Sequence, residues 1–202
     1  MKALWMLFLI FGIAHAETLT GYVVDITDGD TIVVLDANRR QHKVRLAGID
    51  APEKANSEKA PGTAQAFGER SKQNLASIVF NENVTVEGSK QDRFGRTVGK
   101  VMVNGIDANL AQIKAGMAWW YEKYRKEQSP ADQQTYAKAE QRARFQRVGL
   151  WSDKTPTPPW DFRHAKADIQ QEQSCPCLGK LNCTGPKGGQ YCLTESGSKI
   201  YR

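Results

Sequence analysis

The hydrophobic positions between residues 19 and 47 alternate as they do in short β-strands. The stretches GYVVDI, TIVVLD and HKVRLA are rich in Val, Ile and Leu, and polar turn residues separate them. Turns are expected at residues 28–30 and 36–38, because Asp, Asn and Gly tolerate the backbone angles that tight turns need. The pattern predicts a three-stranded meander.

The chain up to about residue 150 predicts two more strands and about three helices. A helix is expected at residues 64–78, and the strand-like stretches NVTVEG and TVGKVMVNG follow it, the second ending in the hairpin-type turn Asn104–Gly105. Asp107 is placed to cap a short second helix, and Ser129, which a proline follows, is placed to cap a third. Five strands with these helices indicate a mainly β fold of the α+β class.

A proline-rich stretch marks the end of this domain. TPTPPW, at residues 155–160, contains too many prolines for a helix or an inner strand. The predicted layout is a signal peptide at residues 1–16, a globular domain at 17–153, a linker at 154–174 and a small appendage at 175–202.

The first sixteen residues have the pattern of a secretory signal peptide. Lys2 gives a positive start, residues 3–13 are mostly apolar, and Ala14 to Ala16 form a small-x-small cleavage site. A membrane anchor is the alternative, but spanning a bilayer takes about 20 apolar residues and this run is shorter. We therefore expect a cleaved signal, a periplasmic or secreted protein, and no stable membrane association after cleavage.

All four cysteines lie in the predicted appendage. Disulfides persist in exported proteins, and the spacing C-x-C-x5-C-x8-C matches no standard zinc finger, so disulfides are favoured over a zinc site. Three pairings are possible. The disulfide candidates are Cys175, Cys177, Cys183 and Cys192.

Three acidic residues lie where predicted strands end: Asp30 before the second strand, and Asp50 and Glu53 after the third. Strand ends in a meander can be neighbours, and carboxylates held that close repel one another unless a cation lies among them. Calcium or magnesium would bind Asp30 and Asp50, with the backbone carbonyl of Ala51 as a further oxygen ligand. Such an incomplete ligand set leaves positions open for substrate, as a catalytic metal requires.

Basic residues accompany these carboxylates. Arg45 lies in the third strand, and Arg93 and Arg96 lie in the tight turn QDRFGRT. An arginine beside acidic groups often forms only an ion pair. Guanidinium groups at an open metal site nevertheless suit a phosphodiester, because they bind phosphoryl oxygens bidentately and stabilise transition-state charge. The net charge of +6 agrees with a polyanionic partner but serves solubility equally well.

Aromatic side chains near these positions add a possible stacking surface for bases. The candidates are Phe94, in the arginine-containing turn, and Tyr121 and Tyr124, in the stretch AWWYEKY. The neighbouring Trp119 and Trp120 are expected to belong to the core.

The motifs DGDT, VRLAGIDAPE and DRFGR, in this order, resemble the staphylococcal nuclease (thermonuclease) family, and the likeness runs from about Gly21 to Trp151. The resemblance implies a five-stranded OB-fold barrel with packed helices, and calcium-dependent (Ca2+) hydrolysis of phosphodiester bonds in DNA and RNA. It does not extend to the cysteine-containing appendage.

The resemblance also implies roles for individual residues. Asp30 and Asp50 match the calcium carboxylates, and Ala51 matches the position that donates a backbone carbonyl. Glu53 matches the residue assigned as general base, and Arg45 and Arg96 match the phosphate-binding arginines. Contacts to phosphate carry no base information, so low sequence specificity is expected.

The alternative function is a non-catalytic OB-fold module that binds nucleic acid or protein, because a fold does not fix an activity. Degenerate relatives would lack some of the charged site residues, whereas this chain has all of them. The sequence therefore predicts an endonuclease acting on DNA and RNA. No obligate protein partner is evident, and a monomer is expected.

Overall fold

The structure is a computed structural model that describes residues 18–55, 64–165, 177, 183–184, 188–194 and 198–201. The predicted signal peptide and Cys175 lie outside the described residues.

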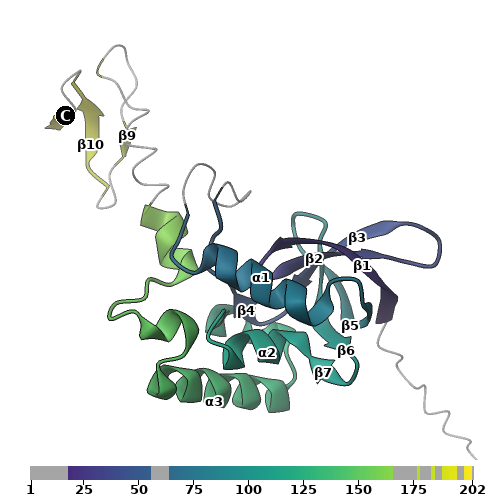
Figure 1. The fold of residues 1–202 in the computed structure, drawn as a ribbon. Coiled ribbons are helices and arrows are strands. Elements are labelled where there is room, and N and C mark those ends of the chain that lie inside the picture. The colour runs from purple at the N-terminus through teal and green to yellow at the C-terminus, as the bar shows by residue number, and fades with distance from the viewer. Residues whose placement is uncertain are drawn as a thin grey trace, which may run out of the picture.

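Five strands close into a barrel, as predicted (Figure 1). They are β1 (Thr18–Asp28), β2 (Thr31–Leu35), β3 (Gln41–Leu46), β5 (Asn83–Gln91) and β6 (Thr97–Val103). The first three form the meander, β5 pairs antiparallel with β1, and β6 pairs antiparallel with β5. A parallel pairing between β3 and β6, with Val44 opposite Thr97 and Leu46 opposite Gly99, closes the barrel. Together with its helices this is an α+β OB-fold.

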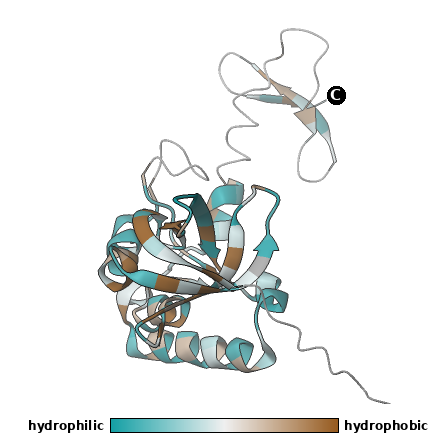
Figure 2. Cartoon of the chain, turned by 90° about the vertical axis from the view of Figure 1, so that its right-hand side faces the viewer, coloured by the Kyte–Doolittle hydropathy of each residue, from teal (hydrophilic) through white to brown (hydrophobic). Residues whose placement is uncertain are grey.

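The barrel core consists of the hydrophobic residues that alternate along these strands. Val23, Ile32, Val44, Val86 and Val101 are each fully buried. Hydrophobic and hydrophilic residues alternate visibly along the strands in Figure 2. Residues i and i+2 of a strand face the same side, so this alternation fills the barrel on one face and leaves the other for helices or solvent.

Three α-helices cover one side of the barrel (Figure 1). They are α1 (Gly68–Val79), α2 (Ala108–Lys114) and α3 (Pro130–Gln146). The helix α2 lies between the other two and contacts β6 as well. Asp107 caps α2 by accepting from the amide of Leu110, and Ser129 caps α3 by accepting from the amide of Asp132, as predicted.

The first helix begins four residues later than the predicted start at residue 64. Phe67 takes a left-handed conformation with φ of 68° and so separates the helix from the residues before it. Gly68 then packs so closely on the backbone carbonyl of Glu53 that a side chain would collide there. The predicted hairpin turn is confirmed, since Asn104 and Gly105 have φ values of 48° and 77°.

Several short elements were not predicted. They are β4 (Ile49–Asp50), β7 (Ile106–Asp107), β8 (Trp119–Trp120), and the 3-10 helices η1 (Glu122–Glu127) and η2 (Gly149–Ser152). The strands β4 and β8 pair antiparallel, which places Ile49 opposite Trp120 and Asp50 opposite Trp119. This two-stranded ladder holds the segment that carries the predicted acidic residues.

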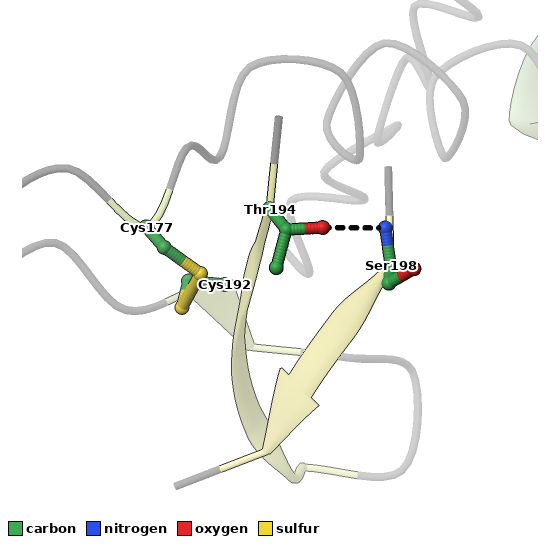
Figure 3. The surroundings of a disulfide bond; sticks show 4 residues. All are labelled: Cys177, Cys192, Thr194 and Ser198. Carbon is green, nitrogen blue, oxygen red and sulfur yellow. Dashed lines mark hydrogen bonds between the residues drawn. A yellow bond between two sulfur atoms is a disulfide. The ribbon is translucent and has the colours of Figure 1, made fainter. Parts of the chain in front are cut away.

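The C-terminal appendage contains a small sheet of β9 (Cys183–Thr184), β10 (Gln190–Leu193) and β11 (Lys199–Tyr201), with β10 in the middle. A disulfide joins Cys177 to Cys192, and the amide of Ser198 donates to the hydroxyl of Thr194 at 3.0 Å (Figure 3). Cys183 is also disulfide-bonded. The prediction of disulfides in this appendage is confirmed.

Candidate active site

Asp50 and Glu53 lie side by side after the barrel strand β3 ends. Asp50 belongs to the β4–β8 ladder. The backbone of Glu53 is hydrogen-bonded to Gln65 through both its amide and its carbonyl. The amide of Gln65 donates to the carbonyl of Glu53 at 2.8 Å, and the amide of Glu53 donates to the Gln65 side chain at 3.2 Å. The two acidic residues are only 3% and 1% exposed, so they are carboxylates that need compensating positive charge.

Asp30 approaches from the turn between β1 and β2. Its carbonyl accepts from the amide of Leu46 at 2.9 Å, which ties the turn to the end of β3. Its side chain accepts from the Thr31 hydroxyl at 2.7 Å. The preceding Gly29 packs against Ala51, where a Cβ on the glycine would lie 2.9 Å from that of the alanine. The fold therefore brings the turn of Asp30 against the segment of Asp50.

Among the described residues, Arg163 places a cation on Asp50 and Glu53. Its guanidinium donates to both carboxylate oxygens of Asp50, at 3.1 and 2.8 Å, and to Oε1 of Glu53 at 2.6 Å. Burial alone would lower the pKa of Arg163, but the hydrogen bonds and charges of the two carboxylates outweigh it and raise the pKa above its ordinary value. Within the part of the chain that the structure describes, no three His, Cys, Asp or Glu side chains gather as a metal site.

Arg163 comes from the segment that the sequence predicts to be a linker. Residues 159–165 are helical, and Trp160, one turn before the arginine, stacks on Tyr121 with ring centroids 4.7 Å apart. Trp160 also meets Trp119 edge-on at 5.6 Å. The carbonyl of Thr157 accepts a hydrogen bond from the side chain of Gln65. The described part of this segment thus packs on the domain beside the acidic residues.

Arg45 lies on β3 next to the same rim of the barrel. Thr31, the neighbour of Asp30, is its partner in the β2–β3 ladder. Its guanidinium is 2.5 Å from Oε2 of Glu127 in η1 and lies over the ring of Tyr124 at 5.2 Å. The residue is 7% exposed, so this buried arginine is oriented by a carboxylate and an aromatic ring.

Arg96 lies in the turn between β5 and β6, directly before Thr97, which pairs with Val44 of β3. An ion pair of 2.6 Å joins it to Asp92 of the same turn. Phe94, at the tip, is 67% exposed, and the guanidinium carbons of Arg93 and Arg96 lie 4.8 and 5.4 Å from the centre of its ring. The tip of this turn therefore carries two arginines and an exposed aromatic ring, and the turn lies beside the strand that carries Arg45.

Two of the predicted stacking residues, Tyr121 and Tyr124, lie close to this rim as well. The rings of Tyr121 and Tyr124 meet edge-on at 4.8 Å, and the amide of Tyr121 donates to the carbonyl of Gly48. Burial and the nearby charge of Asp50 raise the pKa of the Tyr121 hydroxyl. Trp119 is buried in a small core cluster, as predicted, and Trp120 packs against the main core.

Sequence reasoning missed several residues that shape this rim. Arg163 and Trp160 fell in the predicted linker, although two aromatic residues within WDFRH are unusual for a solvated connector. Asn109 and Gln112 of α2 are fully buried and hydrogen-bond backbone atoms of the site segments. Gln112 donates to the carbonyl of Gly29 at 2.6 Å and so holds the turn that carries Asp30.

Known proteins resemble this chain over the same region. A family described as "Staphylococcal nuclease homologue" matches residues 43–153. The micrococcal nuclease of Shigella flexneri is 41% identical over 166 residues, which cover 78% of this chain and 87% of that protein. A protein of Haemophilus influenzae described as an uncharacterized endonuclease is 35% identical over 163 residues, or 81% and 83% of the two chains. An uncharacterized endonuclease of Escherichia coli is 39% identical over 147 residues, or 72% and 86%.

Proposed function

Because this chain belongs to the staphylococcal nuclease family and is a hydrolase acting on phosphodiester bonds, we propose that it cleaves both DNA and RNA, with calcium and with low sequence specificity. One observation carries the proposal: two buried carboxylates, Asp50 and Glu53, share a cation at the barrel rim beside Arg45. A binding module that does no chemistry has no need to bury such a pair.

The donor set of this rim suits calcium. Asp30 and Asp50 would supply carboxylate oxygens and Ala51 a backbone carbonyl, and hard oxygen ligands of this kind are the ones calcium prefers. The bidentate hold of Arg163 on Asp50 supports the fit, because it shows that positive charge is favourable there. When bound, calcium would polarise the phosphoryl group and neutralise its developing charge.

The remaining steps belong to side chains of this chain. Glu53 orients the attacking water and takes its proton, as a general base can when its carboxylate is held in place. Arg45 and Arg96 bind the phosphoryl oxygens and stabilise the charge that gathers on them in the transition state. The nucleophile is water, so no covalent intermediate with the protein forms.

Binding to the rest of the substrate would use the exposed cationic and aromatic surface. The exposed ring of Phe94, near Arg93 and Arg96, can stack on a base, and Tyr121 and Tyr124 offer a second stacking position. These contacts address phosphates and ring faces, which every nucleotide has. They support cleavage with low sequence specificity and strong sensitivity to salt.

We further propose that the protein is exported to the periplasm or beyond. The Cys177–Cys192 disulfide supports this, since such bonds persist in oxidising compartments. None of the described helices has the length and apolar character needed to cross a membrane.

Digestion of labelled single-stranded DNA, double-stranded DNA and RNA tests the function. We expect cleavage of all three in calcium, its loss with a chelator, and a higher calcium requirement for Asp30→Ala. The exposed Asp25→Ala is the matched control and should behave as the wild type. Cleavage that persists in chelator would refute the metal requirement, and binding without cleavage would identify the non-catalytic module.

A further inference from the structure

Residues 157–165, here called the latch segment, cover two parts of the proposed site at once. Arg163 lies on Asp50 and Glu53, and Trp160 stacks on Tyr121 with an interplanar angle of 1°. The first pair involves a proposed metal ligand and the proposed general base, and the second a proposed base-stacking residue. One short helical stretch therefore contacts both the proposed catalytic carboxylates and the proposed base-stacking residue.

We propose that the latch segment is an autoinhibitory device in which the Arg163 guanidinium replaces the divalent cation at Asp50, so that metal binding must displace it. The inference rests on the proposed function in one respect, namely that Asp50 is a metal carboxylate.

The contacts of Arg163 indicate that its guanidinium and a calcium ion cannot both bind Asp50 at the same time. Arg163 engages both oxygens of Asp50 and also Oε1 of Glu53. Calcium binds carboxylate oxygens at about 2.3–2.6 Å, so it would occupy the space now filled by the guanidinium. Two cations that close together would also repel each other strongly in a buried site. Metal at Asp50 therefore requires Arg163 to leave.

The attachment of the latch segment is suited to release. Trp160 and Arg163 are three residues apart, so they lie on one face of the helical stretch, while Asp161, His164 and Ala165 are exposed. The Arg163 side chain itself is 23% exposed and can move to solvent without crossing the core. The segment is anchored at its start by the buried Pro159 and by the hydrogen bond from Gln65 to the Thr157 carbonyl, and beyond that point its ionic and aromatic contacts can open without disturbing the barrel.

Release of Arg163 would also weaken the hold of Trp160 on Tyr121, because both side chains belong to the same helical turns. Metal binding would then uncover the aromatic position together with the carboxylates. The latch segment thus couples metal occupancy to access for substrate, and the enzyme stays closed where divalent cations are scarce.

Calcium titration of the full-length chain by calorimetry tests the proposal. If the latch segment is closed about nine-tenths of the time, Arg163→Ala should bind calcium about tenfold more tightly than the wild type. Trp160→Ala, which leaves the carboxylates untouched, should shift the affinity in the same direction by less. Arg142→Ala, an exposed arginine of α3, is the matched control and should not change it.

Hydrogen exchange supplies a readout that is independent of activity. In the wild type, calcium should speed exchange at amides 160–165 and leave the barrel strands unchanged. Equal or weaker calcium affinity of Arg163→Ala would overturn the latch alone, since the arginine would then tolerate or support the metal. No calcium binding by any of these proteins would overturn the latch and the metal assignment together.

Discussion

Asp92 holds the guanidinium of Arg96 through one carboxylate oxygen, Oδ2, which is 2.7 Å from Nε and 2.6 Å from Nη2. Its other oxygen accepts from the amides of Phe94 and Arg96 at 2.9 and 3.0 Å. Burial alone would raise the pKa of Asp92, but the bonds from Arg96 outweigh it and lower the pKa. One carboxylate therefore shapes the turn and orients the arginine that follows.

Replacing this arginine should abolish most activity without unfolding the protein. We expect Arg96→Ala to reduce turnover about 10²-fold or more, because it removes a preorganised charge from the transition state. Arg96→Lys should recover little, since an ammonium group cannot bind two phosphoryl oxygens in a planar fork. Initial rates at saturating calcium measure the turnover, and melting temperatures of the same variants show whether the fold is kept. Near-normal turnover by Arg96→Ala would remove this residue from the site.

Glu53→Gln should also lower turnover by about 10²-fold or more, because an amide cannot accept the proton of the attacking water. The substitution keeps the size of the side chain and an oxygen that can accept from Arg163, so the fold should be unchanged. The exposed Glu69→Gln on α1 is the matched control. Single-turnover rates of the two variants are the measurement. If Glu53→Gln and Glu69→Gln cleave equally fast, Glu53 is not the general base.

Asn109 should matter for stability rather than for chemistry. Fully buried in α2, it accepts from the amide of Val101 at 3.0 Å and donates to the carbonyls of Ala47 and Gly99, at 3.0 and 3.2 Å. Asn109→Ala leaves the Val101 amide and the Ala47 carbonyl without this partner, while the Gly99 carbonyl still accepts from the Ala47 amide at 2.8 Å. We therefore expect the free energy of unfolding to fall by about 2 kcal/mol or more. Urea denaturation measures it, with the exposed Asn38→Ala expected to change it by less than about 0.5 kcal/mol.

Local patterns predicted most of the barrel and its caps. Alternation identified the five long strands, and short-range capping by Asp107 and Ser129 marked the starts of two helices, because these signals depend on neighbours in sequence. The β4–β8 ladder was not predicted, because each strand has only two residues and the paired residues Asp50 and Trp119 are far apart in the chain. Nothing within two residues of either indicates the pairing.

The candidate site was predictable in its charged residues but not in their partners. Asp50 and Glu53 stand out because they end a strand beside a proline, whereas Arg163 pairs with them across more than a hundred residues. Buried polar residues such as Gln112 were missed for the same reason. Their partners are backbone groups of distant segments, which no local periodicity records.

The stability of α2 should depend on pH through Asp107. Burial raises the pKa of this carboxyl, despite hydrogen bonds from the Leu110 amide and, at 2.8 Å, from the Tyr136 hydroxyl. A carboxyl with a raised native pKa contributes stability below its unfolded pKa of about 3.9 and loses it as the pH rises through the native value. Asp107→Asn keeps an acceptor for both donors and does not ionise.

The free energy of unfolding of the wild type should therefore fall relative to that of Asp107→Asn as the pH rises from about 4 toward neutrality. Denaturation of both proteins at several pH values measures the difference, in which the other ionisable groups largely cancel. A constant difference across this range would show that Asp107 titrates alike in the folded and unfolded chains.

The disulfide between Cys177 and Cys192 should stabilise the appendage without affecting catalysis. The bond spans a sequence separation of 15, and closing a loop of that size stabilises a folded unit by about 3 kcal/mol. All cysteines lie outside residues 17–153, so the barrel has no covalent dependence on the bond. Replacing both residues by serine should speed protease cleavage after residue 176, while the nuclease rate and the melting temperature of the barrel stay unchanged. Loss of cleavage activity in this double variant would instead make the appendage part of the working enzyme, because nothing else in the protein differs.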